Sequence, residues 1–120
     1  MTEAFRKHNV PFAFQVSRST SATVGTNFLW YQAATAIKYG MSKQEALEAL
    51  TLTPAKMHKI DKYVGSIEKG KDADLVVLSG EPLQIDTWVE KTIVNGVIVY
   101  EKEKDDQLRQ LLTGEEQDSE

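Results

Sequence analysis

The sequence predicts an α/β chain, with helices in the first half and strands in the second. Apolar residues recur at helical spacing over about residues 27–39. A continuous apolar run, Leu75–Leu78, is typical of a strand that is covered on both faces. The dipeptide Asn95-Gly96 stands between two β-branched runs, which is the pattern of a two-residue hairpin turn. These three observations fix the class before any single residue is given a role.

Composition indicates one ordinary globular domain. The chain has 120 residues, of which 41% are hydrophobic and 27% charged. A net charge of -4 argues against general binding to nucleic acid or anionic membranes, because phosphate binding needs clustered Lys and Arg. The densest basic segment, residues 56–62, is interpreted as the solvated face of a helix and turn. The chain has no cysteine, which excludes disulfides and thiolate metal ligands.

No signal peptide or transmembrane segment is visible. The first residues, Met-Thr-Glu-Ala-Phe-Arg-Lys, are amphipathic and contain no apolar run. We therefore take the cytoplasm as the default compartment. The sequence leaves open whether the chain is a short natural gene product or a fragment of a longer one.

The first sixty residues read as helices around one strand. Residues 3–9 resemble the last turns of a helix, with basic residues near its end. The aromatic and β-branched run Val10–Val16 predicts a strand, and the small polar stretch Ser17–Thr26 predicts a loop. Asn27 is expected to cap a helix through Tyr39 that Gly40 ends.

Two further helices follow from capping signals. Ser42 and Glu45 form a capping box, which predicts a helix from Lys43 to about Thr51. Thr53 is expected to cap a short helix with Pro54 in its first position.

The second half predicts a small sheet and a tail. Strands are expected over Thr87–Val94 and Val97–Glu101, with a short helix over Lys102–Leu112. Residues 115–120 carry four acids and are expected to be disordered. The predicted regions are therefore residues 1–60, residues 61–102 with the hairpin turn at 94–97, and residues 103–120.

One stretch resembles a known family. Leu50-Thr-x-x-Pro-Ala55 is followed by Gly65-Ser-Ile-x-x-Gly-Lys-x-Ala-Asp-Leu-Val-Val77. This pattern resembles the C-terminal region of metal-dependent amidohydrolases, most closely the imidazolonepropionase-related branch, from about residue 4 to Glu101. The resemblance implies a (β/α)8 barrel flanked by a small β-sandwich. Such a barrel needs about 200 residues or more, so the implied fold is a C-terminal fragment with the last barrel strand, its helices and part of the sandwich.

The same resemblance implies a chemistry and its residues. Family members hydrolyse carbon–nitrogen bonds, many of them not peptide bonds, with water activated by zinc or another divalent metal. The implied ligands are several His, a carboxylated Lys or Glu, and an Asp after the last barrel strand. Only the Asp position falls within this chain, and there residues 12–18 contain no carboxylate. We therefore expect no catalytic residue, no bound metal and no turnover from the isolated chain.

Three residues are candidates for a substrate-facing role. The resemblance places Gln15, Ser17 and Arg18 near the mouth of a barrel site, where Arg18 could pair with an anionic group. The alternative interpretation is a polar loop with no role.

Other polar groups have weaker claims to chemistry. Asp72 and Asp74 alternate at strand spacing and could face the same way. The favoured interpretation is a turn in which a carboxylate accepts local backbone hydrogen bonds. His8 and His58 stand far apart and form no pair at metal-ligand spacing.

Two functional hypotheses follow. The first is the C-terminal part of an amidohydrolase-type hydrolase. The second is a non-catalytic interaction module that forms homo-oligomers, because unpaired strand edges pair with other chains. The contact would use those edges, the Phe28–Ile37 helix face, or the absent N-terminal part of the barrel.

Overall fold

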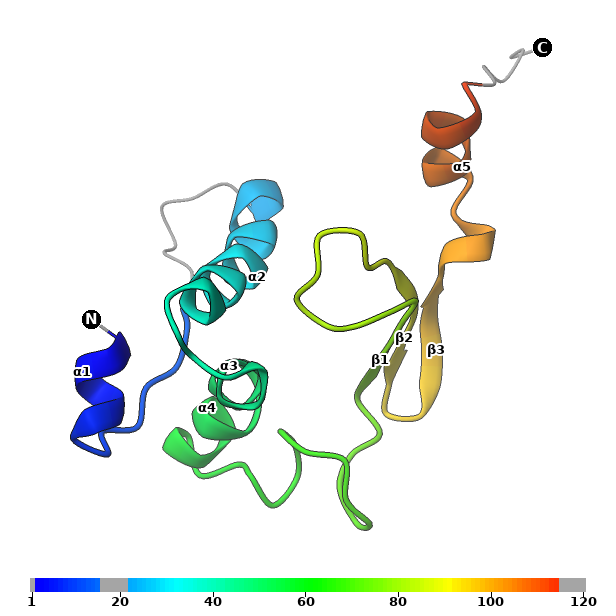
Figure 1. The fold of residues 1–120 in the computed structure, drawn as a ribbon. Helices are drawn as coiled ribbons and strands as arrows, with labels where there is room; N and C mark the ends of the chain where they lie inside the picture. The colour runs from blue at the N-terminus through cyan, green and yellow to red at the C-terminus, as the bar shows by residue number, and fades with distance from the viewer. Residues whose placement is uncertain (1, 16–21, 115–120) are drawn as a thin grey trace. The chain divides into compact units, whose positions relative to one another are not determined.

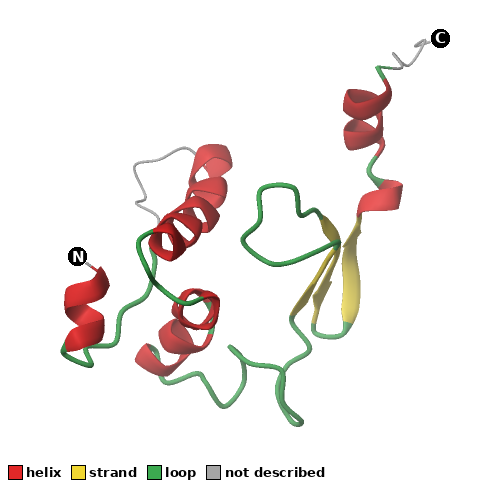
Figure 2. Ribbon diagram, viewed as in Figure 1, coloured by secondary structure: helices red, strands yellow, loops and turns green. Residues whose placement is uncertain are grey.

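The computed structural model describes residues 2–15 and 22–114. The chain divides into two compact units, Met1–Lys71 and Asp72–Glu120, and each is described by itself. Figure 1 labels the helices and strands, and Figure 2 shows that helices build the first unit while all three strands lie in the second. The predicted α/β class is confirmed at this level. Residues 115–120, expected to be disordered, lie outside the described residues.

Unit 1 begins with helix α1 (Thr2–Lys7), which has the predicted basic residues Arg6 and Lys7 in its last turn. The predicted strand Val10–Val16 is wrong over its described part, because residues 10–15 have no regular secondary structure. A strand requires a paired neighbour, and no strand occurs among the described residues of unit 1. The backbone N–H of Phe14 instead donates to the carbonyl oxygen of Ala49 at 3.3 Å.

Helix α2 (Ala22–Lys38) begins earlier than predicted. Asn27 lies inside the helix and does not cap it, and the predicted loop Ser17–Thr26 is helical from residue 22 onward. A capping signal marks where a helix can start, but each residue added to an existing helix gains a backbone hydrogen bond, so the helix extends past it. Gly40 ends the helix as predicted, with φ at 98° and its N–H donating to Ile37.

Helix α3 (Lys43–Leu50) starts at the predicted capping box. The Oγ of Ser42 accepts from the N–H of Glu45 at 3.2 Å, and the Oε2 of Glu45 accepts from the N–H of Ser42 at 2.9 Å. Helix α4 (Leu52–Met57) starts earlier than predicted, because Thr51 stands at its N-cap position. The predicted cap at Thr53 and the predicted first position of Pro54 are therefore wrong, since both residues lie inside the helix. The Thr51 hydroxyl donates to the carbonyl oxygen of Leu47 at 2.8 Å, and α4 has no side-chain cap.

The core of unit 1 is built from small side chains. Helix α3 contacts both α2 and α4. Alanines and one methionine are buried there: Ala33, Ala36, Met41, Ala46, Ala49 and Ala55. Because helix spacing depends on the side chains at the contact, an alanine interface brings helices close together and leaves little room for larger groups.

Unit 2 contains a three-stranded antiparallel sheet with the order β1-β2-β3. The strands are β1 (Leu75–Leu78), β2 (Val89–Val94) and β3 (Val97–Glu101). Asn95 and Gly96 have φ values of 52° and 77°, which confirms the predicted two-residue hairpin turn. After β3, a short 3-10 helix η1 (Lys102–Lys104) and helix α5 (Asp106–Thr113) replace the single predicted helix, because Asp105 caps α5.

The strand predicted to be covered on both faces is not covered. Val76 is 57% exposed and Val77 is 42% exposed. β1 and β3 are the two edges of the sheet, and Leu83 is the only buried hydrophobic residue described in unit 2. An apolar run therefore indicates that a strand forms. Whether the two faces of that strand are buried depends on neighbouring elements that the run does not specify.

No helix within the described ranges is both long enough and apolar enough to cross a membrane.

Candidate functional site

The segment that leads to the substrate-facing candidates is anchored by aromatic rings. Phe12 stacks on Phe5 with ring centroids 6.2 Å apart and meets Phe14 edge-on at 5.9 Å. Gln15 follows and is exposed. Ser17 and Arg18 lie outside the described residues. A role for these three residues in substrate binding therefore stays a prediction.

The described residues do not fit a divalent-metal site. Among them, no group of three or more His, Cys, Asp or Glu could hold a metal ion. His8 and His58 are both exposed and belong to separate helix ends. A catalytic zinc needs about three protein ligands around one point. No step of a metal-assisted reaction can be built from these side chains.

Gly65 of the family-like pattern is a packing residue. Its φ is 96°, which disfavours side chains. A Cβ at this position would lie 2.7 Å from the Cβ of Ala55 and 3.1 Å from the Cα of Leu52. The absence of a side chain thus allows the turn after α4 to lie directly against that helix.

Ser66, Glu68 and Lys71 form a polar network in the same turn. The Nζ of Lys71 donates to the Oγ of Ser66 at 2.5 Å and lies 3.2 Å from the Oε1 of Glu68. The Ser66 hydroxyl donates to Glu68. The hydrogen bond from Ser66, and then the one from Lys71, hold the pKa of the Glu68 carboxyl below its ordinary value of 4.5.

A serine beside a lysine is also a pairing used in nucleophilic catalysis, where the lysine accepts the serine proton. The hydrogen bonds here have the opposite sense. Lys71 donates to Ser66, and the Ser66 proton is directed to Glu68. The side chain of Lys71 is only 11% exposed, so the network fastens the turn.

Asp74 holds the hairpin turn of unit 2. Its Oδ1 accepts from the N–H of Asn95 at 2.8 Å, and the carbonyl oxygen of Ala73 accepts from the N–H of Gly96 at 3.0 Å. Asp74 accepts a backbone hydrogen bond as expected, but the expectation that the donor is local is wrong. The donor lies 21 residues further along the chain, because the hairpin turn folds back onto this segment.

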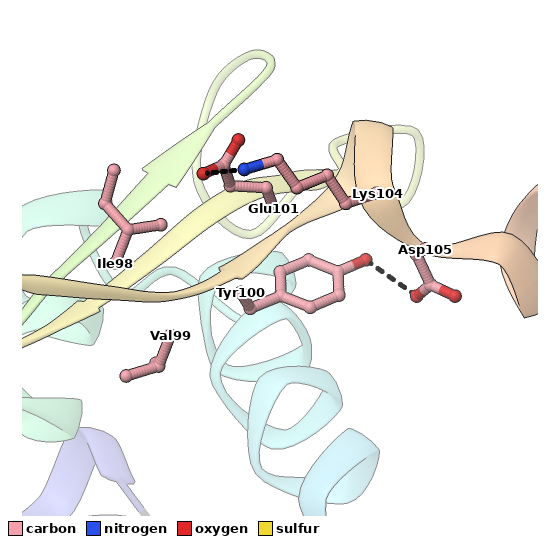
Figure 3. Close-up of a pocket in the computed structure, with 6 residues that line it drawn as sticks. All are labelled: Ile98, Val99, Tyr100, Glu101, Lys104 and Asp105. Atoms are coloured by element: carbon pink, nitrogen blue, oxygen red, sulfur yellow. Dashed lines mark hydrogen bonds and ion pairs between the residues drawn. The ribbon is translucent and has the colours of Figure 1, made fainter.

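An open depression of about 360 Å³ lies beside β3 in unit 2 (Figure 3). It is lined by Ile98, Val99, Tyr100, Glu101, Lys104 and Asp105. The Tyr100 hydroxyl donates to Asp105 at 3.1 Å, and Lys104 pairs with Glu101 at 3.0 Å. The other carboxylate oxygen of Asp105 accepts from the N–H of Leu108 at 2.9 Å and caps α5.

Burial and then the hydrogen bond to Asp105 raise the pKa of Tyr100 above its ordinary value of 10.0. The four polar side chains of the lining therefore pair with one another. This arrangement connects β3 to α5 and provides no activated acid, base or nucleophile.

The chain belongs to the amidohydrolase family. The model of that family matches residues 14–99, which include Phe14, the turn after α4, strands β1 and β2 and the first part of β3. The crystal structure of an amidohydrolase from Thermotoga maritima is similar to 83% of this chain, with a TM-score of 0.74 and 37% sequence identity. The chain covers 25% of that protein.

Curated relatives show the same partial overlap. The putative amidohydrolase YtcJ of Bacillus subtilis is 42% identical over 64 residues, which are 48% of this chain and 12% of YtcJ. An adenine deaminase of Methanosphaera stadtmanae is 35% identical over 69 residues, 58% of this chain and 12% of that protein. The mouse N-acetylglucosamine-6-phosphate deacetylase is 41% identical over 66 residues, 54% of this chain and 15% of the deacetylase. The matched part thus spans about an eighth of these proteins.

Proposed function

We propose that this chain is the C-terminal part of an amidohydrolase-family hydrolase that acts on carbon–nitrogen bonds other than peptide bonds. We further propose that the isolated chain has no turnover. The observation that carries the proposal is the family match over residues 14–99 in a chain whose described residues contain no metal-ligand cluster. One relative is named as a deaminase, which removes an amino group, and another as a deacetylase, which removes an acetyl group from nitrogen, and both names support the bond type.

The family-like pattern has a structural role in this proposal. Gly65 packs against α4, Ser66 and Lys71 fasten the turn, and Asp74 holds the hairpin. Each is engaged in contacts within its own unit, which supports a structural role. We also propose that the chain belongs to the imidazolonepropionase-related branch, which its pattern resembles most closely. Zinc or another divalent metal of the family would need ligands other than the described residues.

The test is a turnover assay of the purified 120-residue chain. The chain is incubated with zinc or manganese and with adenine, N-acetylglucosamine 6-phosphate, a lactam and a dipeptide. We expect product no faster than in buffer with metal alone. Turnover that co-purifies with the chain through several columns and disappears with a chelator would contradict the proposal.

A self-associating module is the second candidate function. Both outer strands of the sheet expose apolar residues, with Val97 63% exposed and Val99 59% exposed on β3. Unpaired strand edges of this kind favour pairing with another chain. Sedimentation velocity at micromolar concentrations should show a dimer or larger species. A single monomeric boundary over the whole concentration series would eliminate this candidate.

A further inference from the structure

The hairpin turn of unit 2 places a reactive pair of residues at an exposed position. Asn95 and Gly96 are both exposed, and both have positive φ. A backbone nitrogen that belongs to glycine is not hindered by a side chain, so it can approach the amide carbon of the preceding asparagine. We infer that Asn95-Gly96 is a site of spontaneous deamidation and that hydrogen bonds to Ala73 and Asp74 slow the reaction.

The reaction needs only water and a base from solvent. The backbone nitrogen of Gly96 loses its proton and attacks Cγ of the Asn95 side chain. The new C–N bond forms, the bond from Cγ to Nδ2 breaks, and the departing nitrogen takes up a proton and leaves as ammonia. Water then opens the cyclic imide at either carbonyl, which leaves aspartate or isoaspartate at position 95.

The folded hairpin blocks the first step of this reaction. The N–H of Gly96, whose proton must be lost, donates to the carbonyl oxygen of Ala73 at 3.0 Å. The N–H of Asn95 donates to the Asp74 carboxylate at 2.8 Å. A carboxylate at this distance also disfavours a second negative charge on the neighbouring backbone amide. The nucleophile is therefore both occupied and electrostatically disfavoured while the two contacts persist.

The modification should consequently proceed from a locally opened hairpin. Its rate equals the rate in the open chain multiplied by the fraction of molecules in which these contacts are broken. Aspartate and isoaspartate at position 95 both make it harder for the opened hairpin to form its native contacts again. Aspartate places a second carboxylate beside Asp74, and isoaspartate adds a backbone carbon to a loop whose length sets the strand register. Deamidation would thus loosen the β2–β3 pairing irreversibly.

The test follows deamidation in the full chain by peptide mass spectrometry at mildly alkaline pH. Wild type is compared with Asp74→Ala and with Asp72→Ala, a matched exposed aspartate two residues earlier in the chain. Wild type in concentrated urea gives the rate of the open chain. Loss of a hydrogen bond to a charged group should open the turn about tenfold more often. We expect Asp74→Ala to deamidate about tenfold faster than wild type and Asp72→Ala to match wild type.

Asp74→Asn separates loss of the contact from general unfolding, because it keeps an oxygen acceptor at the same position. We expect this variant to stay much closer to wild type than Asp74→Ala does. The inference is overturned if native wild type reacts as fast as the chain in urea. It is also overturned if Asp74→Ala reacts no faster than Asp72→Ala.

Discussion

The two units are stabilised in different ways. Unit 1 buries a set of alanines between helices and ends its helices with defined caps. Unit 2 buries only Leu83 among its described hydrophobic residues. It depends instead on the hydrogen bonds of its sheet, on the hydrogen bond from the hairpin turn to Asp74, and on paired polar side chains. Unit 1 should therefore be sensitive to added volume, whereas unit 2 should be sensitive to lost hydrogen bonds.

The largest effect is expected at Gly65. Gly65→Ala should destabilise unit 1 by about 2–4 kcal/mol, because the new Cβ overlaps Ala55 and the φ of 96° is strained. Gly70→Ala is the matched control: its φ is 93°, but no atom lies within 4 Å of the added Cβ. It should cost only about 1–2 kcal/mol. Urea unfolding followed by the helical circular dichroism signal measures both, and equal losses would refute the packing role of Gly65.

The next largest difference between the two units is expected when a larger side chain is introduced into each. Ala46 has no exposed surface, so Ala46→Leu should cost about 1–3 kcal/mol through overpacking. Val97 in unit 2 is 63% exposed, so the larger side chain of Val97→Leu should stay within about 0.5 kcal/mol of wild type. Unfolding in urea reports both values. The contrast fails if Val97→Leu is as costly as Ala46→Leu.

The capping box of α3 supplies a smaller effect. Ser42→Ala should destabilise unit 1 by about 1 kcal/mol, because the N–H of Glu45 loses its acceptor. The hydrogen bonds from the Ser42 backbone and then its side chain hold the pKa of Glu45 below 4.5. The same variant should move that pKa part of the way back upward, because the hydroxyl contact is lost and the backbone contact is kept. An NMR titration of the Glu45 side chain can follow the change. An unchanged pKa would show that the Ser42 hydroxyl does not donate to the Glu45 carboxylate in solution.

One substitution should stabilise unit 1. Lys59 follows α4 with φ at 60°, and the N–H of Ile60 donates to Ala55 at 2.9 Å across it. Lys59→Gly should gain about 0.5–1 kcal/mol by relieving the left-handed conformation. Asn9 has the same role after α1 with φ at 51°, but asparagine tolerates it, so Asn9→Gly should change less. Thermal melts of both variants provide the comparison.

The smallest expected effect is on acid stability. The pKa values of Glu45 and Glu68 are both lowered on folding, so their contribution is fully present above about pH 4.5 and is lost as pH falls through the lowered values. Both carboxylates are exposed, so the slope should be shallow. Urea midpoints measured between pH 6 and pH 2 should decline for wild type. Ser42→Ala should show a weaker decline, and an identical decline in both would contradict the assignment to Glu45.

Features set by neighbouring residues were predictable from sequence. The Ser42 capping box, the Gly40 helix end and the Asn95-Gly96 turn each depend on a few adjacent residues, and the structure confirms all three. Strand Leu75–Leu78 was also found, because its apolar run is continuous.

Features set by distant partners were not predictable. Residues 10–15 have strand-like composition, but the described part of unit 1 offers them no strand to pair with. The exposure of Val76 and the bond from Asn95 to Asp74 depend on which segments meet in space. Of the candidate site, the sequence identified Gln15, Ser17 and Arg18 only through family resemblance, and the structure describes Gln15 alone.

The central claim is that the residues described in this amidohydrolase-family chain maintain a fold and contain no reaction centre. Equilibrium dialysis of the purified chain against zinc, with metal content measured afterwards, tests it most directly. We expect no stoichiometric zinc to remain bound to the chain. One equivalent of zinc that withstands dialysis and is lost on His8→Ala or His58→Ala would contradict the claim.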